Sequence, residues 1–217
     1  GLYKNEEEKQ NIKIVKKNGI KIAFVSFNQY VNGVTYQEKL PYMINFHEST
    51  MMENMKKARE SADIVIVSCH WGIEYDYYPN IFQKNMAKQL ADAGADVIIG
   101  THTHTLQDVE YIQRADGKRT LVAYSLGNFV SGMLEESCQL EGMLSFDIEK
   151  KKIKNVVFTP LVNYYTLTGK RERHDFSVYR LKDYTNKLVE KHGFPNLTIS
   201  HMKEEVKQKV KNIKIDM

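Results

Sequence analysis

Three histidines follow apolar segments of the chain. His102 and His104 belong to a Gly-x-His-x-His pattern that begins at Gly100, and His70 comes shortly after the apolar run at residues 64–67. Alternate side chains of an extended backbone point the same way, so His102 and His104 can face one cavity. Imidazole is a common ligand of metal ions. The pattern therefore predicts a metal site formed by His70, His102 and His104.

The segments around these histidines predict a strand-helix-strand unit. Residues 64–67 and 96–100 have the apolar composition of buried parallel strands, and residues 81–91 place apolar side chains at helical spacing before Gly94. A crossover of this kind makes the two strands parallel and brings them close together. Sites in open α/β sheets lie at the carboxyl ends of such strands. We therefore expect His70 to lie beside His102 and His104.

The rest of the chain predicts a layered α/β domain. In order, we expect a strand at 20–27, a polar loop at 28–41, a helix containing Met51, Met55 and Ala58, a hairpin of 109–113 with 120–124 around Asp116-Gly117, a second hairpin of 142–148 with 153–158, and charged helical segments from residue 183 that are interrupted at 193–195.

Composition limits the class of protein. The chain has 217 residues, of which 42% are hydrophobic, enough for one substantial core. Its formal charge of +4 includes the lysine run at 150–154, which we interpret as a turn or solvated face, and no nucleic-acid motif accompanies it. No stretch is apolar enough to cross a membrane, and residues 1–10 do not resemble a signal peptide, so we expect a soluble chain.

The remaining histidines and the cysteines carry little functional signal. Cys69 and Cys138 have neither CxxC spacing nor a disulfide framework, so they identify neither a compartment nor a metal class. The absence of a cysteine cluster also disfavours metal storage or sensing. Surface or hydrogen-bonded positions are expected for the other histidines, which are His47, His174, His192 and His201.

Several blocks of the sequence together carry a family resemblance. They are His70-Trp71-Gly72 with Glu74 and Tyr75, Pro79 and Gln83, the run from Ala93 to His104, Gln107 and Glu110, and Tyr124-Ser125-Leu126-Gly127-Asn128-Phe129. In combination they resemble the bacterial CapA capsule-synthesis family, also called PgsA or the poly-γ-glutamate capsule type, over about residues 19–147.

The resemblance implies a metallo-dependent phosphatase-like fold, an α/β/β/α β-sandwich flanked by helices, with a two-metal site. By that resemblance His70 and His102 bind one metal and His104 the other, and Mn, Zn or Fe suits these ligands. Family members take further acidic ligands from an amino-terminal half, so this chain looks like the carboxyl-terminal portion of a fold that is incomplete at its amino terminus. Thr103 stands where the family commonly has proline, which we expect to loosen the loop. We expect residues 1–165 to form the family domain and residues 166–217 a helical extension.

Roles for the other site residues also follow from the resemblance. Glu74 and Glu110 are candidates for proton transfer or for orienting an imidazole, with a plain surface carboxylate as the alternative for each. Trp71 and Tyr75 could wall a substrate pocket, although packing is the commoner role of such aromatic residues. Ser125 and Asn128 could line the cavity. A nucleophilic serine is disfavoured because no glycine-flanked elbow surrounds Ser125.

Two classes of function remain open at this point. One is an enzyme of capsule or poly-γ-glutamate biosynthesis that performs metal-dependent hydrolysis or transfer on a phosphoester or a γ-glutamyl amide. The other is a non-catalytic assembly or export subunit of a membrane polymer synthase. Both imply an anionic polymer and membrane-bound synthase subunits as partners, and a place at the extracellular face of the membrane through an amino-terminal anchor that this chain lacks. Because its visible ligands are neutral imidazoles, we expect the chain alone to be a poor hydrolase.

Overall fold

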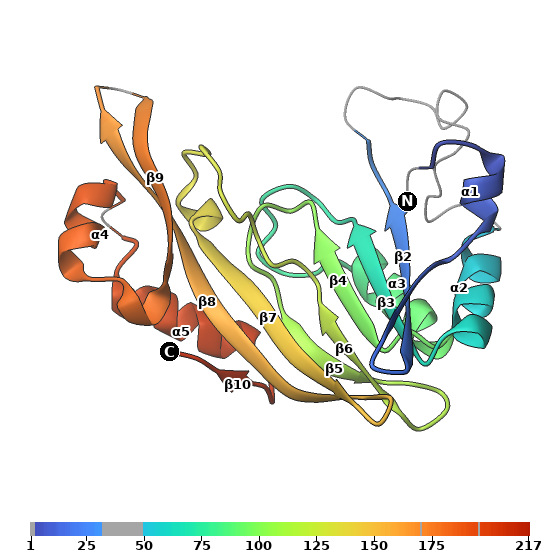
Figure 1. Cartoon of the computed structure of the whole chain (residues 1–217). Coiled ribbons are helices and arrows are strands. Elements are labelled where there is room, and N and C mark those ends of the chain that lie inside the picture. The colour runs from blue at the N-terminus through green and yellow to red at the C-terminus, as the bar shows by residue number, and fades with distance from the viewer. Residues whose placement is uncertain (1–2, 32–49, 170, 195) are drawn as a thin grey trace.

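The computed structural model describes residues 3–31, 50–169, 171–194 and 196–217, and they form two β-sheets flanked by helices (Figure 1). The first sheet has six strands in the order β1-β2-β3-β4-β6-β5. Its strands are β1 (Lys13–Lys17), β2 (Ile20–Asn28), β3 (Ile64–His70), β4 (Val97–Thr101), β5 (Val109–Gln113) and β6 (Arg119–Ala123).

The strand-helix-strand unit predicted for the histidines is confirmed. Strands β3 and β4 are parallel neighbours, with Ile66 opposite Val97 and His70 opposite Thr101. Helix α3 (Ile81–Asp92) joins them, and the side chains of Asn80 and Gln83 cap its first turn reciprocally. Gly94 follows the helix with a φ of +101°, a conformation that glycine adopts without strain. The carboxyl ends of β3 and β4 therefore lie side by side, which is where the three histidines are found.

The hairpin predicted after the histidine loop is also present, and its second strand is the one that joins the parallel part of the sheet. Strands β5 and β6 pair antiparallel, as the Asp116-Gly117 turn predicted. Strand β6 nevertheless lies between β4 and β5 and runs parallel to β4. The parallel part of the sheet thus extends beyond the predicted unit on both sides, to β2 next to β3 and to β6 next to β4.

The second sheet is built on one long strand. Strand β8 (Lys152–Thr168) pairs antiparallel with β7 (Leu140–Glu149) and β9 (Glu172–Arg180), and parallel with β10 (Lys214–Ile215). The second predicted hairpin is confirmed as β7 and β8, whose two-residue turn contains Lys150 and Lys151.

Alternate residues of the first sheet face two separate cores, and this explains the layers. Ile98 and Val122 contribute to a core with α3 and α2 (Thr50–Ser61), which contains the predicted Met51, Met55 and Ala58 face. Ile99 and Ala123, one position further along β4 and β6, pack instead with β7 and β8. The order of layers is therefore helices, first sheet, second sheet, helices, as expected.

The outer helices of the second sheet come from the end of the chain. They are α4 (Asn186–His192) and α5 (Ile199–Lys209), and Gly193 ends α4 with a φ of +81°. Position 195 of the predicted interruption lies outside the described residues. The remaining short elements are the helix α1 (Glu6–Gln10) and the 3-10 turns η2 (Glu136–Cys138) and η3 (Leu181–Asp183).

The carboxyl-terminal part is more than a helical extension, because β9 precedes α4 and pairs with β8. Strand β8 runs through the expected boundary at 165/166, and the second core contains residues from both sides of it, including Phe158, Val162, Met202 and Val206. Among the helices of the described residues, none is both long and apolar enough to span a bilayer.

Candidate metal centre

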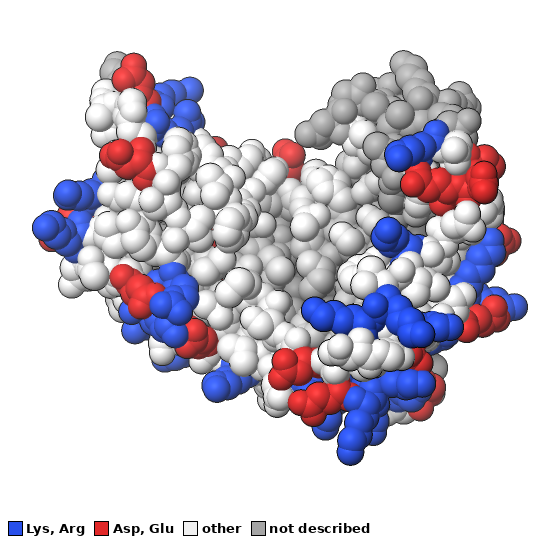
Figure 2. Space-filling model, viewed as in Figure 1, with Lys and Arg blue, Asp and Glu red and all other residues white. Residues whose placement is uncertain are grey.

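The three predicted histidines lie together at the carboxyl ends of β3 and β4. The ring centroids of His70 and His102 are 4.5 Å apart, and those of His102 and His104 are 6.4 Å apart. His70 and His102 are partly buried, and Figure 2 shows that the molecule is hollowed at the end where these strands finish. The imidazoles are therefore close enough to act on one bound group.

The loop that carries His102 and His104 has an unusual backbone. His102 has a φ of +105° and His104 a φ of +63°, and Tyr75 in the facing loop has a φ of +71°. Left-handed backbone costs on the order of 1–3 kcal/mol for a residue other than glycine, and it persists only where the surroundings hold it. Such conformations cluster at functional sites, and here two of them carry imidazoles and the third lies in the facing loop.

Hydrogen bonds of buried threonines hold this loop. Thr103 is fully buried and its hydroxyl donates to the Thr105 carbonyl (3.1 Å), while its own carbonyl accepts from the Tyr75 backbone N–H (2.8 Å). The Thr105 hydroxyl donates to the Asp76 carbonyl (2.6 Å). The Thr103 hydroxyl thus supplies a hydrogen bond that proline lacks, and the expectation that Thr103 loosens the loop stays a prediction.

Asn128 fixes the orientation of His104. The Asn128 Oδ1 lies 2.9 Å from His104 Nδ1, and the Asn128 amide donates to the His104 carbonyl (3.4 Å) and to Met133 Sδ (3.6 Å). With its amide nitrogen turned to two acceptors, Asn128 presents its oxygen to the ring, so Nδ1 carries the proton. His104 Nε2 is then left with a lone pair for a ligand.

The surroundings of His70 and His102 favour the neutral form of each ring. Burial lowers the pKa of His70, and the neighbouring His102 and His104 lower it further. Burial also lowers the pKa of His102. Only the neutral ring ligates a metal ion, so this environment favours the form that binds. His70 Nδ1 lies 3.4 Å from the Thr101 hydroxyl, itself a donor to the Cys69 carbonyl (3.3 Å).

Two candidates from the loop after β3 reach the imidazoles. Glu74 Oε1 lies 3.7 Å from His104 Nε2, and the Glu74 side chain is 45% exposed. The ring centroids of Tyr75 and His104 are 6.0 Å apart. Glu74 therefore stands beside the ring nitrogen that Asn128 leaves without a proton, and Tyr75 forms part of the adjacent surface.

Three other candidates make their contacts elsewhere in the fold. Trp71 is fully buried, and its indole N–H donates to the Tyr124 carbonyl (2.8 Å), so its position is in the core rather than on a pocket wall. Ser125 is also fully buried, and its hydroxyl accepts from the Gly127 N–H (3.2 Å) within the turn that presents Asn128. Glu110 lies on the edge strand β5, where Lys211 is 3.9 Å away. Trp71 thus has the packing role that was its alternative, and Glu110 has the contacts of a plain surface carboxylate.

Some residues beside the cluster had no predicted role. The Tyr30 ring centroid lies 5.3 Å from that of His102, and Gln29 Oε1 accepts from the Gly72 N–H (2.9 Å). Both follow the carboxyl end of β2, the strand next to β3, and that position is the signal that could have identified them. The rest of the expected 28–41 loop beyond residue 31, and His47, lie outside the described residues.

Two buried glutamines support the facing loop. Gln83 donates to Gln107 Oε1 (2.8 Å), and the Gln107 amide donates to the carbonyls of Asp76 (3.0 Å) and Tyr78 (3.1 Å). The segment from Gly72 to Tyr78 is thus connected through Gln107, just before β5, to Gln83 on α3. This network keeps Glu74 and Tyr75 near the imidazoles.

The ligand types at this site suit a divalent transition metal, but their positions do not form a complete coordination shell. Imidazole nitrogens with one neighbouring carboxylate are typical ligands of Zn, Mn or Fe. Within residues 3–31, 50–169, 171–194 and 196–217, however, no group of three His, Cys, Asp or Glu side chains is arranged as a ready metal site. Binding of an ion therefore requires small rotations of these rings or ligands from elsewhere.

Similarity to known proteins covers the segment that contains these residues. The family model of the bacterial capsule synthesis protein PGA_cap matches residues 1–133, which contain all three histidines. The chain belongs to this family. It is 34% identical over 135 residues to the capsule biosynthesis protein CapA of Bacillus anthracis, covering 60% of this chain and 32% of that protein. It is 31% identical over 160 residues to the PGA biosynthesis protein CapA of Bacillus subtilis strain 168, covering 73% of this chain and 41% of the relative.

The chain thus spans about a third to two fifths of the length of these curated PGA_cap relatives. Among solved structures, it is similar to a putative 5'-nucleotidase from Staphylococcus aureus in complex with alpha-ketoglutarate, with a TM-score of 0.46, 13% identity, and coverage of 93% of this chain and 35% of the other. A 5'-nucleotidase precursor from Thermus thermophilus gives a TM-score of 0.39, 17% identity, and coverage of 70% and 29%. The fold assignment rests on the two sheets and the helices that flank them.

Proposed function

We propose that this capsule-synthesis family member binds a divalent metal ion, Mn, Zn or Fe, through His70, His102 and His104. We further propose that the site performs hydrolysis or transfer on a phosphoester or γ-glutamyl amide in capsule polymer metabolism. The observation that carries the proposal is the separation of 4.5 Å between the His70 and His102 rings at two adjacent strand ends. Imidazole is a common metal ligand, and binding sites of α/β sheets usually lie at the carboxyl ends of parallel strands.

Other residues of the chain have distinct roles around the proposed metal ion. Asn128 sets the tautomer of His104, and the buried Thr103 and Thr105 hold the backbone that carries His102 and His104. Glu74, 3.7 Å from His104 Nε2, is placed to ligate or to accept a proton from an attacking water. When bound, a divalent ion would polarise the substrate oxygen and lower the pKa of a water.

The names of the relatives support a role at the cell envelope. Both curated relatives are named for capsule or PGA biosynthesis, and an acidic capsule polymer is the substrate class that we propose. Membrane-bound synthase subunits are the proposed partners, and the extracellular face is the proposed location.

One observation favours the second candidate function, a non-catalytic assembly or export subunit. Glu74 is the carboxylate in contact with the imidazoles within the described part of the chain, and no ready three-ligand group is found there. Two metal ions sharing a water need several anionic ligands, so a site with one carboxylate favours weak occupancy.

An assay of metal-dependent hydrolysis separates the two candidates. The purified chain is incubated with Mn²⁺ or Zn²⁺ and either a chromogenic phosphodiester or poly-γ-glutamate, alongside His102→Ala and a control, His201→Ala, which lies on α5. We expect slow turnover that requires metal, disappears in His102→Ala and persists in the control. Metal binding without any turnover would favour the assembly role, and turnover unchanged in His102→Ala would contradict the proposed site.

A further inference from the structure

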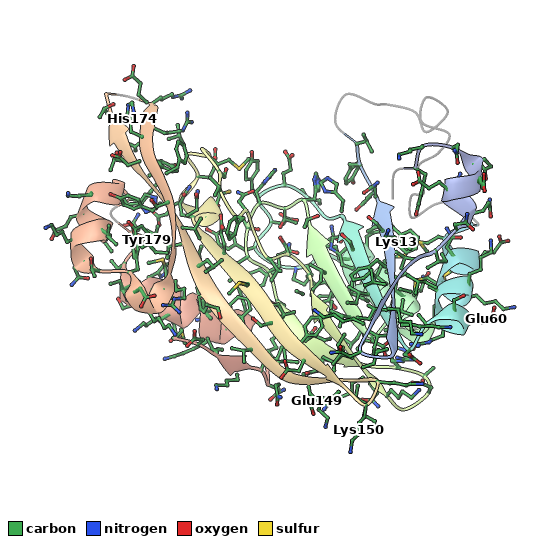
Figure 3. All side chains as sticks on the ribbon, in the orientation of Figure 1. Lys13, Glu60, Glu149, Lys150, His174 and Tyr179 are labelled. Carbon is green, nitrogen blue, oxygen red and sulfur yellow. The ribbon has the colours of Figure 1, made fainter. Side chains whose placement is uncertain are left out.

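A basic groove lies at the end of the molecule opposite the histidines. Its volume is about 680 Å³, and it lies between the ends of the two sheets. The cationic residues that line it are Arg59, Lys118, Arg119, Lys150, Lys151 and Lys152, and the acidic ones are Asp63 and Asp96. Figure 3 shows Lys150 at the tip of the β7–β8 hairpin, far from His174 at the other end of the same sheet.

The groove holds an excess of four positive charges, equal to the formal net charge of the entire chain. The formal charges of all other residues therefore sum to zero. Lys and Arg side chains gather on this end of the surface in Figure 2. A groove lined by one sign of charge focuses the field and attracts ligands of the opposite sign.

Part of that charge is already paired and part is not. Lys151 pairs with Asp63 (2.8 Å) and Arg59 with Asp96 (2.8 Å). Lys118 pairs with Asp116 (3.4 Å), and Asp116 also pairs with Arg114 (3.0 Å).

Three cations of the groove remain for a ligand. Lys150 and Lys152 have no ion pair within the described part of the chain, and the Arg119 guanidinium stacks over the Tyr111 ring at 4.7 Å. All three side chains are exposed. They are the cations most available to an anion that enters the groove.

The turn that presents these lysines departs from common turn chemistry. Lys150 and Lys151 occupy a two-residue hairpin turn with φ values of +47° and +60°. Asn and Gly are the residues preferred at such positions, and a lysine there costs free energy. Charged side chains therefore stand at positions where asparagine or glycine would adopt the backbone with less strain.

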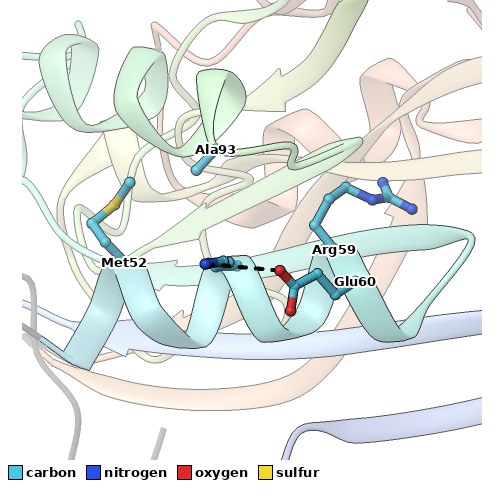
Figure 4. Close-up of a pocket in the computed structure, with 5 residues that line it drawn as sticks. Met52, Arg59, Glu60 and Ala93 are labelled. Atoms are coloured by element: carbon cyan, nitrogen blue, oxygen red, sulfur yellow. Dashed lines mark ion pairs between the residues drawn. The ribbon is translucent and has the colours of Figure 1, made fainter.

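A neighbouring pocket of about 360 Å³ does not share this character (Figure 4). It is lined by Met52, Ala93, Arg59 and the ion pair of Lys56 with Glu60, whose charged atoms are 4.0 Å apart. The unbalanced charge among these lining residues is Arg59, which already pairs with Asp96. The basic groove is therefore the stronger anion-binding feature.

We propose that the basic groove binds a carboxylate-rich polymer chain at a second site, remote from the histidine cluster. This inference rests on the proposed function for the choice of an acidic capsule-type polymer. A concave groove between two sheet ends accepts an extended chain, whereas a flat membrane surface would reach only the projecting hairpin tip. Several carboxylates spaced along one chain would engage Lys150, Lys152 and Arg119 together, and linked contacts strengthen one another.

Polymer binding tests this inference directly. Fluorescence anisotropy of labelled poly-γ-glutamate is measured at low ionic strength for the unmodified chain and for the variant Lys150→Asn/Lys152→Gln/Arg119→Gln. Asparagine suits the positive φ of position 150, so the turn is preserved. Affinity should fall about tenfold or more in this variant, and added salt should weaken binding to the unmodified chain.

A matched control removes the same number of charges from the outer helices. Its substitutions are Lys187→Gln, Lys191→Gln and Lys207→Gln, all at exposed positions of α4 and α5. We expect its affinity to stay within about twofold of the unmodified chain, and thermal melting of every variant verifies folding.

Other outcomes would contradict the proposal that the basic groove binds the polymer. Equal loss of affinity in both triple variants would mean that net charge, not this groove, governs binding. Loss of polymer binding in His102→Ala but not in the groove variant would move the polymer to the histidine site and leave the proposed function intact. Absence of polymer binding by the unmodified chain, or binding of anionic vesicles alone, would also exclude the proposal, while metal binding by the histidines is measured independently.

Discussion

The Asn128 side-chain oxygen lies 2.9 Å from Nδ1 of His104, and this contact joins two loops whose residues are 24 positions apart in the sequence. It explains why the loop after β6 belongs to the site although its serine is buried. The asparagine acts on the imidazole through the far ring nitrogen and leaves Nε2 for a ligand.

Replacement of Asn128 should weaken metal binding without removing a ligand. Asn128→Ala deletes the acceptor that fixes the His104 tautomer, so we expect the metal dissociation constant to rise about 10- to 100-fold. Calorimetric titration with Zn²⁺ or Mn²⁺ measures it, with the exposed Asn186→Ala on α4 as the control. An unchanged dissociation constant in a folded Asn128→Ala variant would contradict the orienting role.

Gly100 should tolerate no side chain. A Cβ at this position would lie 1.9 Å from the Tyr124 carbonyl oxygen and 2.4 Å from Trp71 Nε1. Backbone cannot move away as a flexible side chain can, so Gly100→Ala should reduce the free energy of unfolding by about 3 kcal/mol or more.

A contrasting substitution controls for the general effect of alanine. A Cβ at Gly132 would approach the Arg173 side chain most closely, at 3.2 Å, so Gly132→Ala should cost about 1 kcal/mol or less. Urea denaturation of both variants measures the difference. Equal stability of the two would show that the strands near Trp71 are less tightly packed than described.

Glu141 should make stability depend on pH. This side chain is fully buried, both its carboxylate oxygens lack a hydrogen-bond partner among the described residues, and burial raises its pKa from 4.5 to about 9. The folded protein therefore keeps a proton that the unfolded chain releases. The stability carried by the protonated form is complete below the unfolded pKa and is lost as pH rises through the folded pKa.

Glu141→Gln removes the titrating group, so the variant should lack this pH dependence. Between about pH 5 and 8, the unfolding free energy of the unmodified chain should fall about 1.4 kcal/mol per pH unit more steeply than that of the variant. Denaturant midpoints across this range measure the slope, and Glu149→Gln, at the exposed end of β7, should leave it unchanged. Parallel profiles for the unmodified chain and Glu141→Gln would show that Glu141 is solvated or paired.

Lys209 should connect the last helix to the loop of Glu74. Its side chain is only 3% exposed, and its ammonium donates to the Tyr77 carbonyl (2.6 Å) and lies 4.8 Å from the Tyr78 ring centroid and 3.8 Å from Glu205. Lys209→Met leaves the mostly buried Glu205 without this partner, so we expect a loss of about 3 kcal/mol in stability.

The same variant should speed amide hydrogen exchange in residues 72–78, because the Tyr77 carbonyl loses its donor. The exposed Lys207→Met on the same helix is the matched control. Exchange in residues 72–78 that is identical in both variants would show that α5 does not restrain this loop.

Local patterns were sufficient to predict much of the architecture. The apolar runs before His70 and His102, with an amphipathic helix between them, correctly predicted β3, α3 and β4 and the meeting of three imidazoles. Period-2 and period-3.6 patterns reflect burial of one face, and this is a property that neighbouring residues carry by themselves.

Features that depend on distant segments could not be predicted in the same way. The insertion of β6 beside β4, the burial of Trp71, and the pairing of Glu110 with Lys211 each depend on contacts across the fold. The hydrogen bond of Thr103 could not be predicted for a related reason, since a buried hydroxyl finds its acceptor only once the loop has closed. The basic groove likewise arises because the 114–118 turn and the 150–151 turn come from different sheets.

Metal titration of the histidine variants tests the central claim most directly. Isothermal calorimetry with Zn²⁺ and Mn²⁺ is performed on the unmodified chain, His70→Ala, His102→Ala and the control His201→Ala. We predict saturable binding by the unmodified chain and the control, and a rise of at least about tenfold in the dissociation constant for each site variant. Binding of equal strength in all four proteins, or no binding by the unmodified chain, would contradict the assignment of His70, His102 and His104 to a metal centre.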